Sequence, residues 1–333
     1  MKDEFEKPVL RKNSGSRKWD TLHETFGRPD ILPMWIADMD FPFAQPITEA
    51  LAEKVRHRIY GYPVEEDSLK QAVVDRIGRK FNWQIDSSWL IFSTGVVHAL
   101  HMLVMAFTRP GDGVILQPPV YYPFYSAIKN NGCAVIENPL LYTEGRYTLD
   151  FKGLKSAFEP DRSGFKVNPS RARMLLLCSP HNPVGRVWRK EELQRAAEIV
   201  SDNDGLIISD EIHAELLFKG NIHTPTASLG KELAKKTITC FSASKTFNLA
   251  GLMTSVIIIP EPKIRSLFME RTAGFLGHPG VFGMAATKAA FKYGDPWLEG
   301  LLEYLEENLA LLKSFFAKRI KKIQVIEPEG SYL

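Results

Sequence analysis

The feature that most constrains the fold is a regular alternation of two apolar patterns. Short continuous runs rich in Val, Ile and Leu are typical of buried strands, and stretches with helical spacing separate them. This alternation is typical of parallel strands linked by helices. We therefore predict an α/β fold, a three-layer, doubly wound and mostly parallel sheet. The strand-like runs lie at 89–92, 114–116, 134–136, 174–178, 205–209, 237–241 and 256–259.

The stretches between the runs predict helices that cover the sheet. Ile47, Leu51, Val55 and Ile59 recur at every fourth position and would form one apolar face of a helix over 45–59. Similar patterns predict further helices, one with Leu69, Val73 and Ile77 on its face and others at 96–107, 190–203, 261–275, 281–292 and 295–320.

Two polar segments and one mixed segment do not fit either pattern. Residues 1–32 are irregular and are expected to form an arm, and residues 143–170 are expected to cover the surface. Residues 34–42 mix apolar and acidic side chains without a helical period. They are either a loop that crosses between two domains or a plain linker, and the sequence leaves both interpretations open.

Length and charge restrict the class of protein. A chain of 333 residues is long enough for one large domain and a smaller one. Lys and Arg total 42 and Asp and Glu total 39, so the excess of +3 gives no reason to expect nucleic acid or an anionic membrane as a partner. Residues 1–7 lack the apolar core of a signal peptide, and no apolar run approaches the roughly 20 residues of a membrane span.

The cysteines indicate the redox setting. Cys133, Cys178 and Cys240 show neither metal-ligand nor CxxC spacing, and no metal site is expected. Cys178 and Cys240 lie in strand-like runs, where thiols are usually buried. A reducing, cytoplasmic setting is the natural expectation.

Polar or glycine residues follow five of the predicted strands at their carboxyl ends. They are Gly95, Tyr121, Asn182, Asp210 and Lys245. In doubly wound sheets, ligands bind beyond the carboxyl ends of the strands. We therefore expect these five residues to line one ligand site.

Lys245 is the residue most open to a chemical interpretation. It follows a strand that ends in Ser242 and Ser244, so its amine would lie beside a bound anion. This arrangement suits a lysine that forms a Schiff base with pyridoxal 5'-phosphate (PLP). A short motif of this kind is more often a surface lysine after a strand, but the shared placement of the other four residues favours chemistry.

The remaining residues would serve a PLP ring. Asp210 ends a buried strand and would pair with the protonated ring nitrogen, although a helix N-cap is the alternative. Asn182 would donate to the ring phenolate, unless it is a turn residue before Pro183. Tyr121 would stack on the ring or donate to the phenolate, unless it is a packed core tyrosine. His213 could lie near the ring, but a structural role is favoured.

A glycine turn between a strand and a helix is suited to the phosphate. The backbone N–H groups of Gly95, Val96 and Val97 would face an anion at the start of the helix, and the dipole of the helix would favour a negative charge there. Ser242 and Ser244 would add their hydroxyls. The pattern is weaker than a Walker loop.

The sequence resembles the fold-type I PLP enzymes, the aspartate-aminotransferase superfamily. Within them it is similar to the MalY/PatB branch of cystathionine β-lyases or cysteine C–S lyases. The motifs that carry this resemblance are MWIADMDFP, STGVVHAL, PPVYYPF, SPHNPVGRVW, SDEIHAEL and SASKTFNLAGL, which occur in the family order between about Met34 and Ser331.

The resemblance implies a role for each of these residues. Lys245 would be the Schiff-base lysine, Asp210 the partner of the pyridine nitrogen, and Asn182 and Tyr121 the groups beside the phenolate. Tyr121 would also be catalytic. The remaining assignments are Gly95, Val96, Val97 and Ser242 for the phosphate, Tyr60 for the phosphate of the neighbouring subunit in a homodimer, and Trp35, Ala37 and Asp38 for the border of the substrate site.

The resemblance also divides the chain. Residues 1–45 would be an N-terminal arm with part of the small domain, 46–285 the large PLP-binding domain, and 286–333 the start of the C-terminal small domain. Relatives carry beyond this point the arginine that binds the substrate α-carboxylate, so the small domain is expected to be incomplete here. The last three residues, 331–333, are expected to begin a strand.

The implied activity is PLP-dependent β-elimination on cystathionine or a related cysteine thioether, an amino-acid substrate, giving a thiol, pyruvate and ammonia. The alternative is a class I/II aminotransferase, which shares the early steps. Many aminotransferases place an arginine eight residues after the lysine, where Met253 stands here. That difference favours the lyase branch. A DNA-binding regulator on this fold would need a longer and more basic N-terminal segment.

Overall fold

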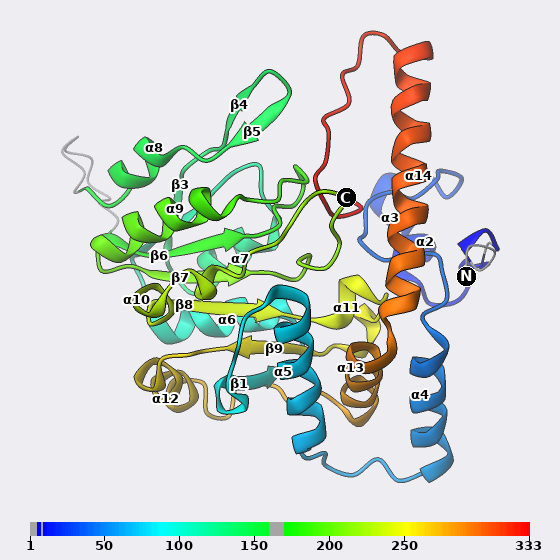
Figure 1. Ribbon diagram of the computed structural model, residues 1–333, viewed down its shortest axis with the longest axis horizontal. Helices are drawn as coiled ribbons and strands as arrows, with labels where there is room; N and C mark the ends of the chain where they lie inside the picture. Colours follow the sequence, from blue (N-terminus) through cyan, green and yellow to red (C-terminus); the bar gives the residue numbers. More distant parts are fainter. Residues whose placement is uncertain (1–4, 8, 160–169) are drawn as a thin grey trace.

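A seven-stranded sheet forms the centre of the computed structural model, which describes residues 5–7, 9–159 and 170–333 (Figure 1). The strand order across the sheet is β1-β9-β8-β7-β6-β2-β3. The strands are β1 Leu90–Ser93, β2 Asp112–Leu116, β3 Ala134–Glu137, β6 Ser170–Cys178, β7 Leu206–Asp210, β8 Thr237–Phe241 and β9 Ser255–Ile258. A separate hairpin pairs β4 Leu141–Thr143 with β5 Arg146–Thr148.

The sheet is mostly parallel, as predicted. β3, β2, β6, β7 and β8 pair in parallel in that order. β9 is the exception, because it runs antiparallel to both β8 and β1. The carboxyl ends of the parallel strands therefore meet at one edge of the sheet, where the predicted site residues follow them.

Helices cover both faces of the sheet, which confirms the predicted three layers. One face packs against α6 Val96–Phe107, α7 Pro123–Lys129 and α12 Pro262–Arg271 through a buried cluster that contains Leu103, Phe124 and Phe268. The other face packs against α8 Phe151–Ser156 and α9 Lys190–Asp202 at one side. At its other side that face meets α5 Asp67–Phe81 and α13 Val281–Tyr293.

The remaining helices surround this sandwich. They are α2 Arg17–Asp20, α3 Leu22–Phe26, α4 Gln45–His57, α10 Lys231–Ala234, α11 Ala243–Thr246 and α14 Asp295–Arg319, with short 3-10 turns at Ser87–Trp89, Thr226–Ser228 and Ala250–Leu252. The long helix α14 stands beside the sheet (Figure 1), and its Tyr304 lines one cavity with Trp19 of α2.

A buried arginine ties α5 to the turn after β7 and to the start of α14. The Arg76 side chain is fully buried and donates to Glu215 at 2.5 Å and to Asp295 at 2.6 Å. A charge buried this completely is tolerated because two carboxylates neutralise it.

Some local predictions were wrong. The helix predicted over 45–59 ends at His57, and two residues of its proposed apolar face, Val55 and Ile59, are 55% and 70% exposed. The arm predicted to be irregular contains α2 and α3. Residues 331–333 form no strand. Part of the predicted surface segment 143–170, residues 160–169, lies outside the described residues.

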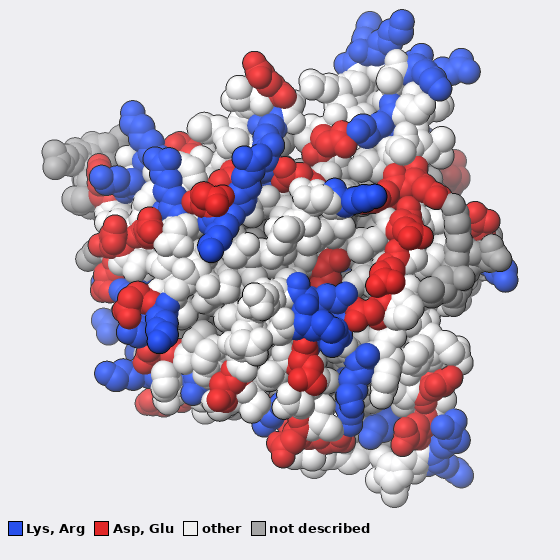
Figure 2. All heavy atoms as spheres, viewed as in Figure 1, with Lys and Arg blue, Asp and Glu red and all other residues white. Residues whose placement is uncertain are grey.

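The surface carries both signs of charge. On the face drawn in Figure 2, basic and acidic side chains are interspersed. Across the described part of the chain, none of the helices combines the length and apolar character needed to cross a bilayer.

Candidate active site

A cavity of about 880 Å³ lies at the carboxyl edge of the parallel strands. Its wall contains most of the residues predicted from sequence, which the fold brings together from segments far apart in the chain. The predicted residues that line it are Trp35, Ala37, Gly95, Val96, Val97, Tyr121, Asn182, Asp210, His213, Ser244 and Lys245.

Lys245 lies on the short helix α11, directly after β8. Ser242 caps this helix, because its hydroxyl accepts the backbone N–H of Ser244 at 3.0 Å. The Lys245 Nζ donates to the carbonyl of Ala37 at 2.7 Å. Burial lowers the pKa of Lys245, while the charges of Asp38 and Asp210 act in the opposite direction. A lowered pKa increases the share of neutral, nucleophilic amine.

Asp210 ends β7 and is 4% exposed. Its Oδ1 accepts the backbone N–H of Ile212 at 3.2 Å. The pKa of Asp210 is raised to about 7, mainly by burial and also by the charge of Glu211, while the hydrogen bond from Ile212 and the charge of Lys245 lower it. Within the described residues no Lys or Arg side chain forms an ion pair with it. A buried carboxyl on a cavity wall without such a partner fits a ligand that brings a cationic nitrogen, which is what the PLP ring would supply.

The start of α6 provides a place for an anion. Gly95 is the N-cap residue with φ 147°, a conformation that favours glycine, and no atom lies within 4 Å of the position a Cβ would take. Val96 and Val97 begin a helix of 12 residues whose N-terminus faces the cavity. The backbone N–H groups there have no helical partner and would bind a phosphate.

Three more predicted residues line the cavity. They are Tyr121, Asn182 and His213. Burial raises the pKa of Tyr121 to about 12, so its phenol stays protonated and can donate a hydrogen bond. Burial lowers the pKa of His213 to about 3, so its ring is neutral, and its Nδ1 lies 3.3 Å from the hydroxyl of Ser331. The neutral ring can pack against a ligand without adding charge.

Three predicted residues do not line this cavity. The Ser242 hydroxyl donates to the carbonyl of Thr254 at 2.7 Å, in addition to capping α11. The Asp38 carboxylate accepts two bonds from Arg11, each of 3.1 Å. The Tyr60 side chain is 55% exposed and packs on the ring of Phe282.

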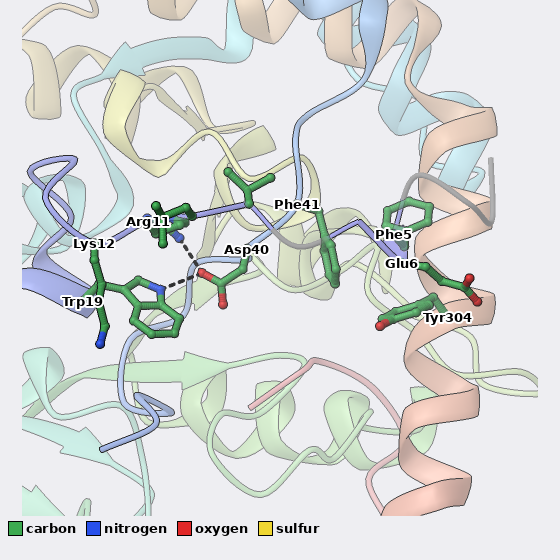
Figure 3. A pocket seen from close by; sticks show the side chains of 10 residues that line it. Phe5, Glu6, Arg11, Lys12, Trp19, Asp40, Phe41 and Tyr304 are labelled. Atoms are coloured by element: carbon green, nitrogen blue, oxygen red, sulfur yellow. Dashed lines mark hydrogen bonds and ion pairs between the residues drawn. The ribbon is translucent and has the colours of Figure 1, made fainter. Parts of the chain in front are cut away.

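The ion pair of Asp38 is part of a cluster that holds the 34–42 segment against the arm. Asp40 accepts bonds from Arg11 at 3.0 Å, Trp19 at 2.9 Å and Lys18 at 2.7 Å. Arg11, Trp19 and Asp40 also border a second cavity of about 680 Å³, which Tyr304 of α14 lines as well (Figure 3). The 34–42 segment is therefore a fixed loop, and its Trp35 and Ala37 form one wall of the candidate active site.

Sequence reasoning did not assign several residues of the wall. Arg17, Tyr122, His98 and Leu333 all line the cavity. Tyr122 was within reach of prediction, since it belongs to the same motif as Tyr121. Arg17 lies in a polar arm without periodicity or motif, so no sequence signal distinguishes it from the other basic residues there.

Comparisons with known proteins show the family to which the chain belongs. The sequence model of the family "Aminotransferase class I and II" matches residues 37–333. The chain is 40% identical to cystathionine beta-lyase PatB of Bacillus subtilis over 332 residues, covering 99% of this chain and 83% of that protein. It is 29% identical to the protein MalY of Escherichia coli, covering 99% and 82%.

Two solved structures show the same architecture. Cystalysin from Treponema denticola, which contains pyridoxal 5'-phosphate, superposes with a TM-score of 0.91 at 38% identity, covering 98% of this chain and 81% of that one. The PLP-bound C–S lyase from Staphylococcus hominis gives a TM-score of 0.89 at 30% identity, covering 98% and 80%. These findings confirm the resemblance drawn from the motifs, and the chain belongs to the aminotransferase class I and II family.

Proposed function

We propose that this protein is a PLP-dependent carbon–sulfur β-lyase. Its substrate would be cystathionine or a related cysteine thioether, which with one water gives a thiol, pyruvate and ammonia. The observation that carries the proposal is that the Lys245 amine and the buried carboxyl of Asp210 line one cavity with the N-terminus of α6. The relatives named as cystathionine β-lyase and C–S lyase support elimination as the reaction.

The residues present fit the cofactor. Lys245 would hold it covalently, Asp210 would pair with its ring nitrogen, and Asn182 and Tyr121 would face its phenolate oxygen. The N–H groups of Gly95, Val96 and Val97, with the Ser244 hydroxyl, would hold the phosphate. When bound, PLP withdraws electrons from the Cα of an attached amino acid.

The chain's own residues then manage protons and orientation. The neutral amine of Lys245, favoured by its lowered pKa, takes the proton from Cα of the substrate. The Ala37 carbonyl, 2.7 Å from Nζ, holds this amine on the side of the 34–42 loop. The Tyr121 phenol, protonated because its pKa is about 12, acts as a hydrogen-bond donor and not as a base. The Cβ–S bond breaks, and the protonated amine of Lys245, which carries the proton taken from Cα, can return that proton to the departing thiolate.

Release of pyruvate from L-cystathionine without any keto acid tests this proposal. We expect the wild-type protein to release it, and Lys245→Ala to lose at least about a thousandfold in rate, because the base and the point of attachment are both removed. Lys235→Ala, which changes an exposed lysine paired with Glu232, should retain the activity. Strict dependence on a keto acid would overturn the lyase proposal in favour of an aminotransferase.

We further propose that the protein is a homodimer with shared active sites and that it works in the cytoplasm. Tyr60 would reach the phosphate in the partner's site, which agrees with its position away from the cavity of its own chain. Cys133, Cys178 and Cys240 are buried free thiols, which suits a reducing compartment.

A further inference from the structure

The N-terminal arm contributes a cation to the candidate active site. Arg17, the first residue of α2, lines the cavity beside Trp35 and Tyr121. Its guanidinium carbon lies 6.0 Å from the centre of the Trp35 ring. Its charge is felt at the Tyr121 phenol, whose pKa is raised mainly by burial and is partly lowered by Arg17. The guanidinium therefore lies on the cavity wall and not merely on the arm.

Arg17 differs from the neighbouring basic residues because it has no carboxylate partner among the described residues. Arg11 and Lys18, on either side of it, pair with Asp38 and Asp40. Asp20, on the same short helix, accepts backbone N–H groups of Asn13 and Ser16. The acidic side chains near Arg17 are thus already engaged, and its charge faces a cavity that an anionic ligand can enter.

The position of Arg17 in the cavity determines which part of a bound ligand it can contact. Asp210 and Lys245 are at the buried end of the cavity, whereas Arg17 is exposed, at its mouth. The amine of an amino-acid substrate must reach Lys245, so its Cα and α-carboxylate lie toward the buried end. A carboxylate at the mouth would belong to the far end of a longer substrate. Guanidinium groups bind carboxylates with two parallel hydrogen bonds, which gives both affinity and orientation.

We propose that Arg17 is a specificity-determining residue that binds the distal carboxylate of thioethers whose leaving thiol is itself an amino acid, such as L-cystathionine. This inference rests on the proposed lyase function. It predicts that the arm discriminates long, doubly zwitterionic substrates from short S-alkyl cysteines.

The test compares L-cystathionine with S-ethyl-L-cysteine, which has no distal carboxylate. For Arg17→Gln we expect KM for L-cystathionine to rise about tenfold, and kcat/KM for S-ethyl-L-cysteine to stay within about twofold. Arg17→Lys, which keeps the charge but not the paired donors, should recover part of the loss. Arg28→Gln is the matched control, because Arg28 lies in the same arm but pairs with Asp30 at the surface.

Binding without turnover gives a second readout. In the Lys245→Ala background, calorimetric titration with L-cystathionine should show a Kd about tenfold higher when Arg17→Gln is added. Equal losses on both substrates would overturn the proposal, since Arg17 would then act on the α-carboxylate or through Trp35. Unchanged kinetics on both would also overturn it, as would the absence of L-cystathionine binding. If the wild type cleaves neither substrate but Arg17→Gln still weakens binding, the subsite stands and the lyase function falls.

Discussion

At the scale of single residues, Asp210 shows that burying a functional carboxyl costs free energy. Its carboxyl is buried at the end of β7, where it accepts a hydrogen bond from the backbone N–H of Ile212. A water-exposed carboxyl is ionised at neutral pH, whereas burial raises the pKa of Asp210 to about 7 and makes its ionisation less favourable in the absence of a cation. The buried carboxyl therefore destabilises the folded protein when the cofactor is not bound.

Replacing Asp210 by Asn should make the stability of the cofactor-free protein less sensitive to pH. Burial raises the pKa of Asp210 from 3.8 to about 7, so the folded state holds this proton more tightly than the unfolded chain. The stabilisation from the proton is complete below the unfolded pKa and is lost as the pH rises through the folded pKa. Wild type therefore loses this stabilisation between about pH 5 and about pH 8, and Asp210→Asn does not. The unfolding free energy of Asp210→Asn minus that of wild type should rise by about 2 to 3 kcal/mol over this range.

Urea unfolding of both cofactor-free proteins at the two pH values measures this difference. Asp204→Asn, which changes an exposed carboxylate, should follow the wild-type pH dependence. If the unfolding free energies of wild type and Asp210→Asn change equally between the two pH values, the Asp210 carboxyl ionises in the folded protein without destabilising it, which would contradict this prediction.

The sequence allowed most of these residues to be predicted because they follow strands. The carboxyl end of a parallel strand determines where the next residues lie, so Lys245, Asp210 and Asn182 could be placed together before any coordinates. Asp38 could not be placed, because its orientation depends on Arg11 and Lys18, which come from a segment without periodicity. The direction of the Ser242 hydroxyl likewise depends on the carbonyl of Thr254, the residue just before β9.

At the scale of elements, the side chain of Asn248, together with that of Lys245, holds the loop over 34–42 to the lysine helix. Asn248 lies just after α11 with φ 58°, a left-handed conformation that asparagine tolerates well. Its Oδ1 accepts the backbone N–H of Met39 at 2.9 Å, and its Nδ2 donates to the carbonyls of Met39 and Phe41, each at 2.9 Å. These bonds fix the loop that carries Ala37 relative to Lys245.

Asn248→Ala should therefore impair catalysis as well as stability. It leaves three backbone groups of the loop without this partner, and we expect a loss of about 1 to 3 kcal/mol in unfolding free energy. A displaced Ala37 carbonyl should lower kcat more than it raises KM, because it orients the base and not the substrate. Asn221→Ala, which changes a half-buried asparagine bonded to Phe218, is the control. A stability loss with unchanged kcat would restrict Asn248 to a structural role.

The order and direction of strands were only partly predictable. Alternation of strands and helices indicated a parallel sheet, and five strands obey it. β9 runs in the opposite direction. The length of the segment between β8 and β9 explains why this direction could not be predicted from the sequence. A parallel crossover needs a dozen or more residues, and residues 242–254 are close to that limit. Their length alone therefore allows either direction.

At the scale of the whole molecule, one chain supplies most of the residues proposed for the active site, and Tyr60 is the residue proposed to come from a partner. Tyr60 follows α4 in a segment whose large side chains face outward, including Ile59, Tyr62 and Val64. Such a cluster of exposed apolar side chains is typical of a surface that another molecule covers. A second copy of the chain is the partner that the proposed function requires.

Co-expression of two inactive variants tests this arrangement. Lys245→Ala and Tyr60→Ala should each be impaired, but a mixed dimer contains one site with both native residues. Random pairing in a two-fold dimer should then restore about a quarter of the wild-type activity. Activity no greater than the sum of the separate variants would contradict a site shared between subunits.

The pairing of β1 with β9 also has a consequence for the order in which the protein forms. During synthesis, Leu90–Ser93 leave the ribosome long before their partner strand Ser255–Ile258 exists. Contacts so distant in sequence form slowly, and the apolar edge of an unfinished sheet is prone to aggregation. Gly95 follows β1, and Lys245 lies between β8 and β9. Gly95, at the end proposed to bind phosphate, and Lys245, at the end proposed to bind the amine, are therefore brought together only when β9 enters the sheet. We infer that the ligand cannot stabilise the chain during the earlier stages of folding.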